Sequence, residues 1–236
     1  MNHDSRHLGY DLEELERRLL TMAALAEARL RMAVRGLVER NHELLAEVVS
    51  GDAKLNDLQI EIDDRCFTLI ALQQPVAVDL RMIVSAMKIN CDLERVGDLA
   101  VNVGQAAQSY LQHPPVKPLI DLPRMGELAL KMLREAIHGF VSGDVGAAQG
   151  VLQQDDLLDA LKDQVFREVL THMLGNPSTI EPGVDLVLIS RHLERVGDHA
   201  TNIAEDVIFI EDGRDVRHRS VKPIVERRRR SDMTPI

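Results

Sequence analysis

The 236-residue chain contains no tryptophan, and aromatic residues make up only 3% of it. Its apolar content comes mainly from alanine, leucine, valine and methionine, which predicts an aliphatic core. Apolar and polar residues hardly ever alternate with a period of two, so we expect no β-strand. Together these absences favour an all-α fold.

Cysteine is also scarce, because Cys66 and Cys91 are the only two and they form no CxxC pair. This usage gives no disulfide framework and fits a reducing compartment, with both cysteines expected in the core. No run approaches the roughly 20 apolar residues of a membrane span. The polar start Met1–His7 is not followed by the apolar segment of a signal peptide. We therefore expect a cytoplasmic protein without a membrane span.

The formal net charge is −10, and it is unevenly distributed. Basic residues outnumber acidic ones in residues 214–236, which include Arg227–Arg230, whereas the rest of the chain is strongly acidic. An acidic body argues against direct binding of nucleic acid, whose phosphates require a basic surface. We expect residues 214–236 to be a disordered, solvated tail, although contact with nucleic acid, anionic lipid or an acidic protein stays an alternative for it.

One decapeptide occurs twice. Leu93–Asn102 reads LERVGDLAVN and Leu193–Asn202 reads LERVGDHATN, with eight identities at an offset of 100 residues. In each copy a glutamate, an aspartate and an asparagine are four residues apart, which aligns them along one side of a helix. They border a stripe of apolar residues at steps of three and four, so they are expected to face the groove toward a neighbouring helix. Gly97 and Gly197 indicate close helix packing at the same place.

Apolar periodicity predicts that a three-helix unit is present twice. Apart from two short helical pieces, 41–50 and one just before 153, the expected helices cover residues 8–40, 53–73, 76–112, 121–142, 153–174 and 178–212. Ser142–Asp144 is expected to be the counterpart of the helix stop at Ser50–Asp52. The predicted architecture is two tandem three-helix bundles, 1–116 and 117–213, joined by the proline-containing linker 113–118 and followed by the tail.

The second helix of each unit adds acidic residues four apart, and antiparallel packing would direct them toward the decapeptides. The candidate metal ligands are Asp57, Glu61, Glu94, Asp98 and Asn102 in the first unit, and Asp159, Asp163, Glu194, Asp198, Asn202 and Asp206 in the second. Carboxylates gathered in one groove repel each other unless protons or cations neutralise them. Oxygen ligands suit magnesium, calcium, manganese or iron. A solvated acidic face is the alternative for every one of these residues, and Asp155 is interpreted in that way.

No catalytic constellation accompanies the acidic residues. A di-iron carboxylate enzyme would carry Glu-x-x-His on its helices, but Gly97 and Gly197 occupy the histidine positions. His192 and His199 flank only the second decapeptide and are expected on the surface. No nucleophile triad or phosphate-binding loop is evident. A carboxylate-bridged metal hydrolase or oxidase and a scaffold without metal remain the alternatives to a metal-carrying binding protein.

The sequence resembles the PhoU family of phosphate-signalling regulators in Ala71–Arg81, Asp92–Asp98 and Arg191–Glu205, within similarity that spans residues 8–218. The resemblance implies two similar three-helix bundles that hold metal clusters, with iron, manganese, magnesium or a similar cation, at the paired acidic motifs. It also implies a non-enzymatic, cytoplasmic negative regulator of the phosphate-starvation response. The expected partners are a sensor histidine kinase, the ATPase of a high-affinity phosphate ABC transporter and, in a homodimer, a second copy of the chain.

Overall fold

The computed structural model describes residues 4–51 and 53–217. Within these ranges the chain is built from helices and contains no strand, which confirms the predicted all-α class. The elements are α1 (Asp4–Val38), α2 (His42–Val49), α3 (Ala53–Gln73), α4 (Ala77–Tyr110), α5 (Asp121–Ser142), α6 (Val145–Gly175), the short 3-10 helix η1 (Pro177–Thr179) and α7 (Ile180–Asp212).

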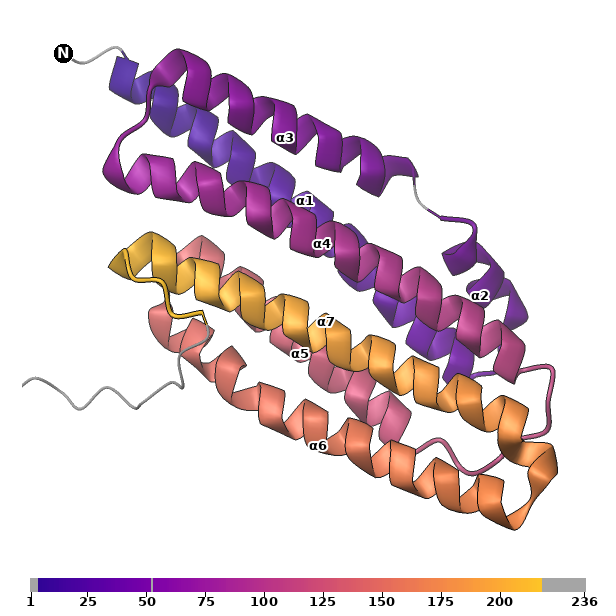
Figure 1. Cartoon of the computed structure of the whole chain (residues 1–236). Coiled ribbons are helices and arrows are strands. Elements are labelled where there is room, and N and C mark those ends of the chain that lie inside the picture. Colours follow the sequence, from indigo (N-terminus) through magenta and orange to yellow (C-terminus); the bar gives the residue numbers. More distant parts are fainter. Residues whose placement is uncertain (1–3, 52, 218–236) are drawn as a thin grey trace, which may run out of the picture.

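The helices form two elongated units that lie side by side (Figure 1). In the first unit α1, α3 and α4 pack together and α2 contacts α1 and α4, while α5, α6 and α7 form the second unit. The units meet along α4 and α7, which run antiparallel, and along α1 and α5. The predicted domain boundary at residue 116 falls in the connection between α4 and α5. The tandem three-helix architecture is therefore confirmed.

The core follows the aliphatic stripes of α4 and α7, because each of these helices is covered both by its own unit and by the other unit. The stripe residues are fully buried: Ile89, Leu93, Val96, Ala100 and Val103 in α4, and Ile189, Leu193, Val196, Ala200 and Ile203 in α7. Burying a leucine or isoleucine side chain contributes roughly 1.5–3 kcal/mol. These contributions hold the decapeptides in the middle of the molecule.

The second unit departs from the prediction in α6, which runs unbroken from Val145 to Gly175 instead of beginning with a separate short piece. Gly51 follows α2 with a φ of 78°, in the left-handed region that glycine adopts most easily. Gly150 stays inside α6, where it costs about 1 kcal/mol relative to alanine without breaking the helix. In the second unit α6 thus takes the place of both α2 and α3 of the first unit.

The caps show which segments correspond. Asn41 accepts hydrogen bonds from the first amides of α2, and Asp144 accepts one from the start of α6. The preceding residues, Arg40 and Gly143, both have positive φ. The turn before α6 therefore corresponds to the turn before α2, at an offset of 103 residues. The predicted equivalence of Ser142–Asp144 with Ser50–Asp52 is wrong, because the segment that matches α6 has an additional break between the end of α2 at Val49 and the start of α3 at Ala53.

The end of α7 is tied to the start of α4. The Arg81 guanidinium donates from Nε and Nη2 to the Ile210 carbonyl oxygen, at 3.1 and 3.0 Å. Such bonds satisfy one of the carbonyl groups that a helix C-terminus leaves without an intrahelical partner. Residues up to Arg217 are described after α7, and the remainder of the predicted tail, 218–236, lies outside the described residues. Across the described parts of the chain, no helix has the length and apolarity needed to cross a membrane.

Candidate functional site

Both decapeptides contact the second long helix of their own unit through glycine. A Cβ atom on Gly97 would lie 3.0 Å from Leu55 Cδ1 of α3, and one on Gly197 would overlap Leu158 Cδ2 of α6. The missing side chains therefore let α3 approach α4 and let α6 approach α7. The prediction of close helix packing at both glycines is confirmed.

The groove between α6 and α7 brings together acidic residues from both helices. Lys162 Nζ lies 2.9 Å from Asp159 Oδ1, 2.9 Å from Glu194 Oε1 and 4.0 Å from Asp163 Oδ1. One ammonium group thus bridges a carboxylate of α6 to the decapeptide glutamate. The structure places Asp159 and Glu194 together as the spacing predicted, and it adds a lysine that the sequence reasoning did not consider.

Two further carboxylates, Asp155 and Asp198, belong to the same groove. Partial burial, followed by the charges of Asp198 and Asp159, raises the pKa of Asp155 to about 6. Partial burial and the charge of Glu194 raise the pKa of Asp198 as well. We call Asp155, Asp159, Glu194 and Asp198 the second-unit acidic cluster. The interpretation of Asp155 as a merely solvated residue is wrong; its position four residues before Asp159 was the signal that could have identified it.

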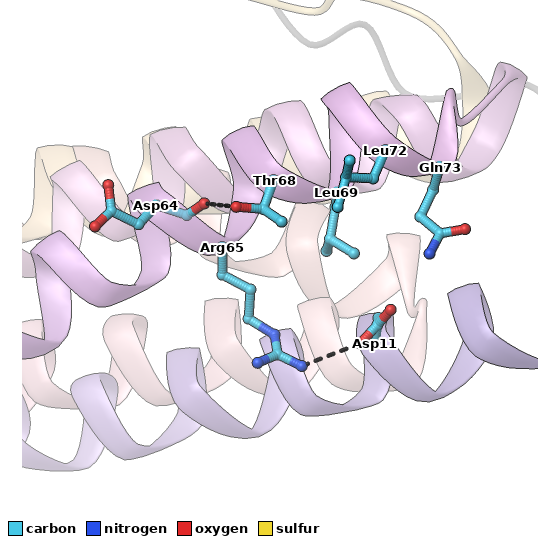
Figure 2. A pocket seen from close by; sticks show the side chains of 7 residues that line it. All are labelled: Asp11, Asp64, Arg65, Thr68, Leu69, Leu72 and Gln73. Carbon is cyan, nitrogen blue, oxygen red and sulfur yellow. Dashed lines mark hydrogen bonds and ion pairs between the residues drawn. The ribbon is translucent and has the colours of Figure 1, made fainter.

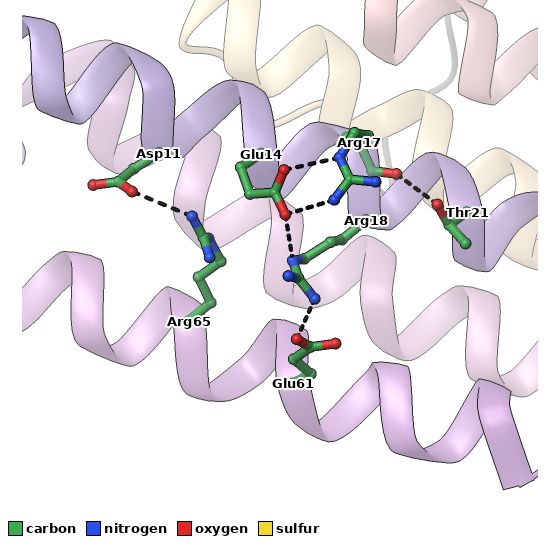
Figure 3. A network of polar contacts seen from close by, with 7 residues as sticks. All are labelled: Asp11, Glu14, Arg17, Arg18, Thr21, Glu61 and Arg65. Atoms are coloured by element: carbon green, nitrogen blue, oxygen red, sulfur yellow. Dashed lines mark hydrogen bonds and ion pairs between the residues drawn. The ribbon is translucent and has the colours of Figure 1, made fainter.

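The first unit does not assemble the equivalent set. The Glu61 carboxylate of α3 forms an ion pair with Arg18 of α1, and Arg18 also contacts Glu14 at 3.0 Å (Figure 3). Asp57 is exposed. Glu61 is therefore held on the α1 side of α3, and the described contacts do not bring Asp57 or Glu61 to the decapeptide in α4.

The decapeptide acids of the first unit instead surround an arginine on their own helix. Arg95 lies 3.5 Å from Glu94 Oε2 and 3.6 Å from Asp98 Oδ2. Partial burial and the charge of Asp98 raise the pKa of Glu94. Two carboxylates of the predicted ligand set are thus adjacent here, and Asn102 lies half-buried further along α4.

The difference between the units is one of register. Leu55 and Ile62 of α3 are buried like Leu158 and Val165 of α6, which is an offset of 103 residues. Asp159 therefore corresponds to residue 56 rather than to Asp57, and one residue rotates a side chain by about 100° around a helix. By the same offset Asp155 corresponds to residue 52, which lies outside the described residues.

The column predicted along α7 also does not stay in one groove. Four residues turn a helix by about 400°, so a column with this spacing drifts by about 40° at each step. Asn202 consequently faces α4, where its Nδ2 donates to Asp92 Oδ1 at 3.1 Å. Asp206 is buried and its Oδ1 lies 2.8 Å from Lys88 Nζ. Asn202 and Asp206 lie at the contact between the units, away from the second-unit acidic cluster.

Two predictions of exposure are reversed at this contact. His199 was expected on the surface, but its Nδ1 lies 2.7 Å from Asp92 Oδ1, and the two side chains are only 16% and 14% exposed. Cys91 was expected in the core and is exposed, whereas Cys66 is buried as predicted. The packing of α4 against α7 decides both outcomes, because a single helix does not indicate which of its sides the other unit covers.

A separate pocket lies between α1 and α3 (Figure 2). It has a volume of about 300 Å³ and is lined by Asp11, Asp64, Arg65, Thr68, Leu69, Leu72 and Gln73. Arg65 reaches across it to Asp11, with Nη2 at 3.2 Å from Oδ1. The Thr68 hydroxyl donates to the Asp64 carbonyl oxygen at 2.8 Å. No nucleophile with an adjacent base lines this pocket, so its residues do not indicate catalysis.

Among residues 4–51 and 53–217, no three histidine, cysteine, aspartate or glutamate side chains converge in an arrangement that could hold a metal ion. The second-unit acidic cluster fits a hard cation in its chemistry, since its donors are all carboxylates. In the structure, Lys162 supplies the positive charge that faces these carboxylates. The first unit offers a poorer fit because Glu61 is engaged by Arg18.

Comparison with known proteins places this arrangement in a family. The model of the PhoU domain matches residues 19–107 and again residues 122–207. The chain belongs to the PhoU family. Each match contains one decapeptide and the long helices of one unit, so the PhoU domain is the unit that is duplicated here.

Relatives and solved PhoU structures cover nearly the whole chain. A Caulobacter vibrioides protein named phosphate-specific transport system accessory protein PhoU homolog is 38% identical over 88% of this chain and 90% of its own length. A protein of the same name from Aquifex aeolicus is 37% identical over 90% of this chain and 96% of its own length.

The solved structures give the same result. PhoU from Pseudomonas aeruginosa superimposes with a TM-score of 0.84 at 33% identity, over 87% of this chain and 99% of that one. The phosphate transport system regulatory protein PhoU from Streptococcus pneumoniae gives a TM-score of 0.81 at 28% identity, over 89% of this chain and 99% of that one. Both PhoU-domain matches end before the basic tail.

Proposed function

We propose that this chain is a non-catalytic accessory protein that restrains phosphate uptake and the phosphate-starvation response. The observation that carries the proposal is the PhoU-domain match over both units, together with relatives of nearly equal length that are named phosphate-specific transport system accessory proteins. In this role the chain is a cytoplasmic adaptor between the ATPase of a high-affinity phosphate ABC transporter and a sensor histidine kinase.

Exposed apolar side chains support a protein-binding role. Around the connection between α3 and α4, Leu72 in the last turn of α3, Val76 in the connection and Val78 in the first turn of α4 are 75%, 73% and 53% exposed. Gln74 in the connection and Ala77, the first residue of α4, have φ of 46° and 49°, a conformation that costs a non-glycine residue of the order of 1 kcal/mol. Exposed apolar residues on a constrained loop are typical of a surface that another protein covers.

A cation in the second-unit acidic cluster is a further part of the proposal. Asp155, Asp159, Glu194 and Asp198 would supply the oxygen ligands, and Lys162 would move aside. The raised pKa values of Asp155 and Asp198 support it, since they reflect partial burial and repulsion that a bound cation would offset. The first-unit ligand set stays a prediction. Elemental analysis of protein purified without chelator tests the metal, and a metal-free product would contradict this part.

The adaptor role is tested by co-purification. Tagged chain is expected to retain the phosphate-transporter ATPase and the sensor kinase from the same cell, each tested singly. A Val76→Asp variant should retain less partner, because it places a charge on the exposed apolar connection. Val141→Asp on α5 is the matched control, since Val141 is also exposed, at 43%, but lies at another site. Failure of the unmodified chain to retain either partner would contradict the adaptor role.

A further inference from the structure

Exposed apolar side chains gather where α6 and α7 approach the turn that joins them. On each helix three large apolar residues recur at steps of four, and all six are exposed: Phe166, Leu170 and Leu174 on α6, and Ile180, Val184 and Leu188 on α7. A spacing of four keeps each trio on one side of its helix. Leu174 is 80% exposed, although leucine is among the residues most often buried. We call these six residues the hairpin patch.

The two apolar rows lie on helices that are in close contact at this level. A Cβ on Gly183 would lie 2.6 Å from Met173 Cε and 3.1 Å from Val169 Cγ1 of α6. Gly183 directly precedes Val184, and Met173 directly precedes Leu174, so the two rows run beside this contact. Each row extends for about 12 Å along its helix. Adjacent exposed apolar rows of this kind are typical of a surface that another protein covers.

The row on α7 continues into two arginines. Arg191 and Arg195 follow Leu188 at steps of three and four on the same side of the helix, and both are exposed. Arg95, the counterpart of Arg195 in the first decapeptide, lies within 3.6 Å of two carboxylates. In the second unit Lys162 binds the decapeptide glutamate instead, and no carboxylate of residues 4–51 and 53–217 forms an ion pair with Arg191 or Arg195. These two cations therefore suit an acidic partner.

The hairpin patch is separate from the connection between α3 and α4, and the two lie at opposite ends of the molecule (Figure 1). Arg81, near the start of α4, binds the Ile210 carbonyl oxygen near the end of α7. The start of α7, which carries half of the patch, is consequently at the far end of this antiparallel pair. A protein bound at Val76 would leave the hairpin patch accessible.

We propose that the hairpin patch, together with Arg191 and Arg195, binds an amphipathic helix of another protein. The bound helix has apolar side chains at one end and acidic side chains at the other. From Ile180 to Arg195 the surface extends about 22 Å, which corresponds to a helix of about 15 residues. The apolar end packs on both rows, while the arginines pair with the carboxylates and fix the direction of the helix. This inference goes beyond the proposed role in phosphate regulation, which assigns no binding partner to this surface.

Fluorescence anisotropy with a labelled helical peptide tests the proposal. The peptide has about 15 residues, with leucines at steps of three and four in one half and glutamates on the same side of the other half. A matched peptide carries lysine in place of each glutamate. Both peptides are titrated with the full-length unmodified protein and with three full-length variants. Val184→Asp and Leu170→Asp each place a charge on one apolar row, and Arg191→Gln/Arg195→Gln removes the two cations.

Two controls carry the same kind of charge at other exposed sites. They are Val141→Asp on α5 and Val76→Asp at the opposite end of the molecule. Thermal unfolding followed by circular dichroism verifies that every variant is folded. Because all the substituted side chains are exposed, the substitutions should leave the Tm nearly unchanged.

The glutamate peptide is expected to bind the unmodified protein at least about tenfold more tightly than the lysine peptide. Val184→Asp and Leu170→Asp should each weaken its binding about tenfold or more, whereas the controls should change it less than about twofold. Without the two arginines, the affinities of the two peptides should agree within about threefold.

Equal or absent binding of the two peptides to the unmodified protein would overturn the proposal, as would unchanged binding by both aspartate variants. Sedimentation equilibrium examines the alternative occupant. Self-association of the unmodified protein that Val184→Asp abolishes would also overturn the proposal and assign the hairpin patch to a second copy of the chain.

Discussion

Replacing Asp155 by asparagine should stabilise the protein at neutral pH, even though it removes a charged residue from the groove between α6 and α7. The environment of Asp155 raises its pKa from 3.8 to about 6, mainly through partial burial and then through the charges of Asp198 and Asp159. The full difference between these pKa values corresponds to roughly 3 kcal/mol of unfavourable free energy when the group is ionised. We expect Asp155→Asn to gain about 1–2 kcal/mol, because partial solvation screens the repulsion.

The gain must depend on pH in a defined direction. Asp155 binds its proton more tightly in the folded protein than in the unfolded chain, so folding becomes less favourable as the pH rises from about 4 to about 6. Below about pH 3 the carboxyl group is protonated in both states, and the variant and the unmodified protein should differ little on this account. Above pH 6 the full difference should appear.

Urea unfolding followed by circular dichroism at pH 4, 5, 6 and 7, with EDTA present, measures the difference. The matched control is Asp156→Asn, the exposed neighbour on α6, which should change stability by less than about 0.5 kcal/mol. The reasoning about the second-unit acidic cluster is refuted if Asp155→Asn is no more stable than this control at pH 7, or if its advantage does not shrink toward pH 4.

Three further predictions concern the contacts between the units and the proposed cation. Gly126→Ala should destabilise by about 1–3 kcal/mol in thermal unfolding, because its Cβ would lie 2.8 and 2.9 Å from the two γ-methyl groups of Val34, a stiff side chain; recovery in Gly126→Ala/Val34→Ala would confirm the contact. Lys88→Met should lower the free energy of unfolding in urea at pH 7 by about 1–3 kcal/mol, because it leaves the Asp206 carboxylate buried without its ion pair. The control Lys131→Met removes an exposed ion pair and should lower it by less than about 0.5 kcal/mol. Manganese at 100 times its Kd should raise the free energy of unfolding by about 2.7 kcal/mol, both in the unmodified protein and in Gly126→Ala. If manganese left the Tm unchanged, that result would contradict the cation site.

The helices and the core could be predicted because their signals are local. The stripe that includes Leu93 and Val96 repeats every three to four residues, so burial of that face follows from one helix alone. The tight contact at Gly97 and Gly197 was also predictable, since a helix interior retains glycine at a cost of about 1 kcal/mol only where something offsets that cost. A glycine alone does not predict a helix break, because Gly51 follows the end of α2 whereas Gly150 stays helical within α6.

The candidate site was harder to predict because it depends on relations between helices. Nearly equal spacing to the decapeptides suggested that Asp57 matches Asp159. The register of α3 differs from that prediction by one residue, and Glu61 forms an ion pair with Arg18 of α1 instead of facing α4. No local pattern indicates that α4 and α7 pack together, so the contact of His199 with Asp92 was not foreseen. Such pairings follow from how the two units pack.

Expression of phosphate-regulated genes tests the central claim most directly. A strain that lacks this chain, grown in abundant phosphate, is expected to transcribe its phosphate-starvation genes at the level of starved cells, and the unmodified gene should restore repression. Transcription that stays low in the deleted strain, and equals that of the parent at both high and low phosphate, would contradict a regulatory role in phosphate transport.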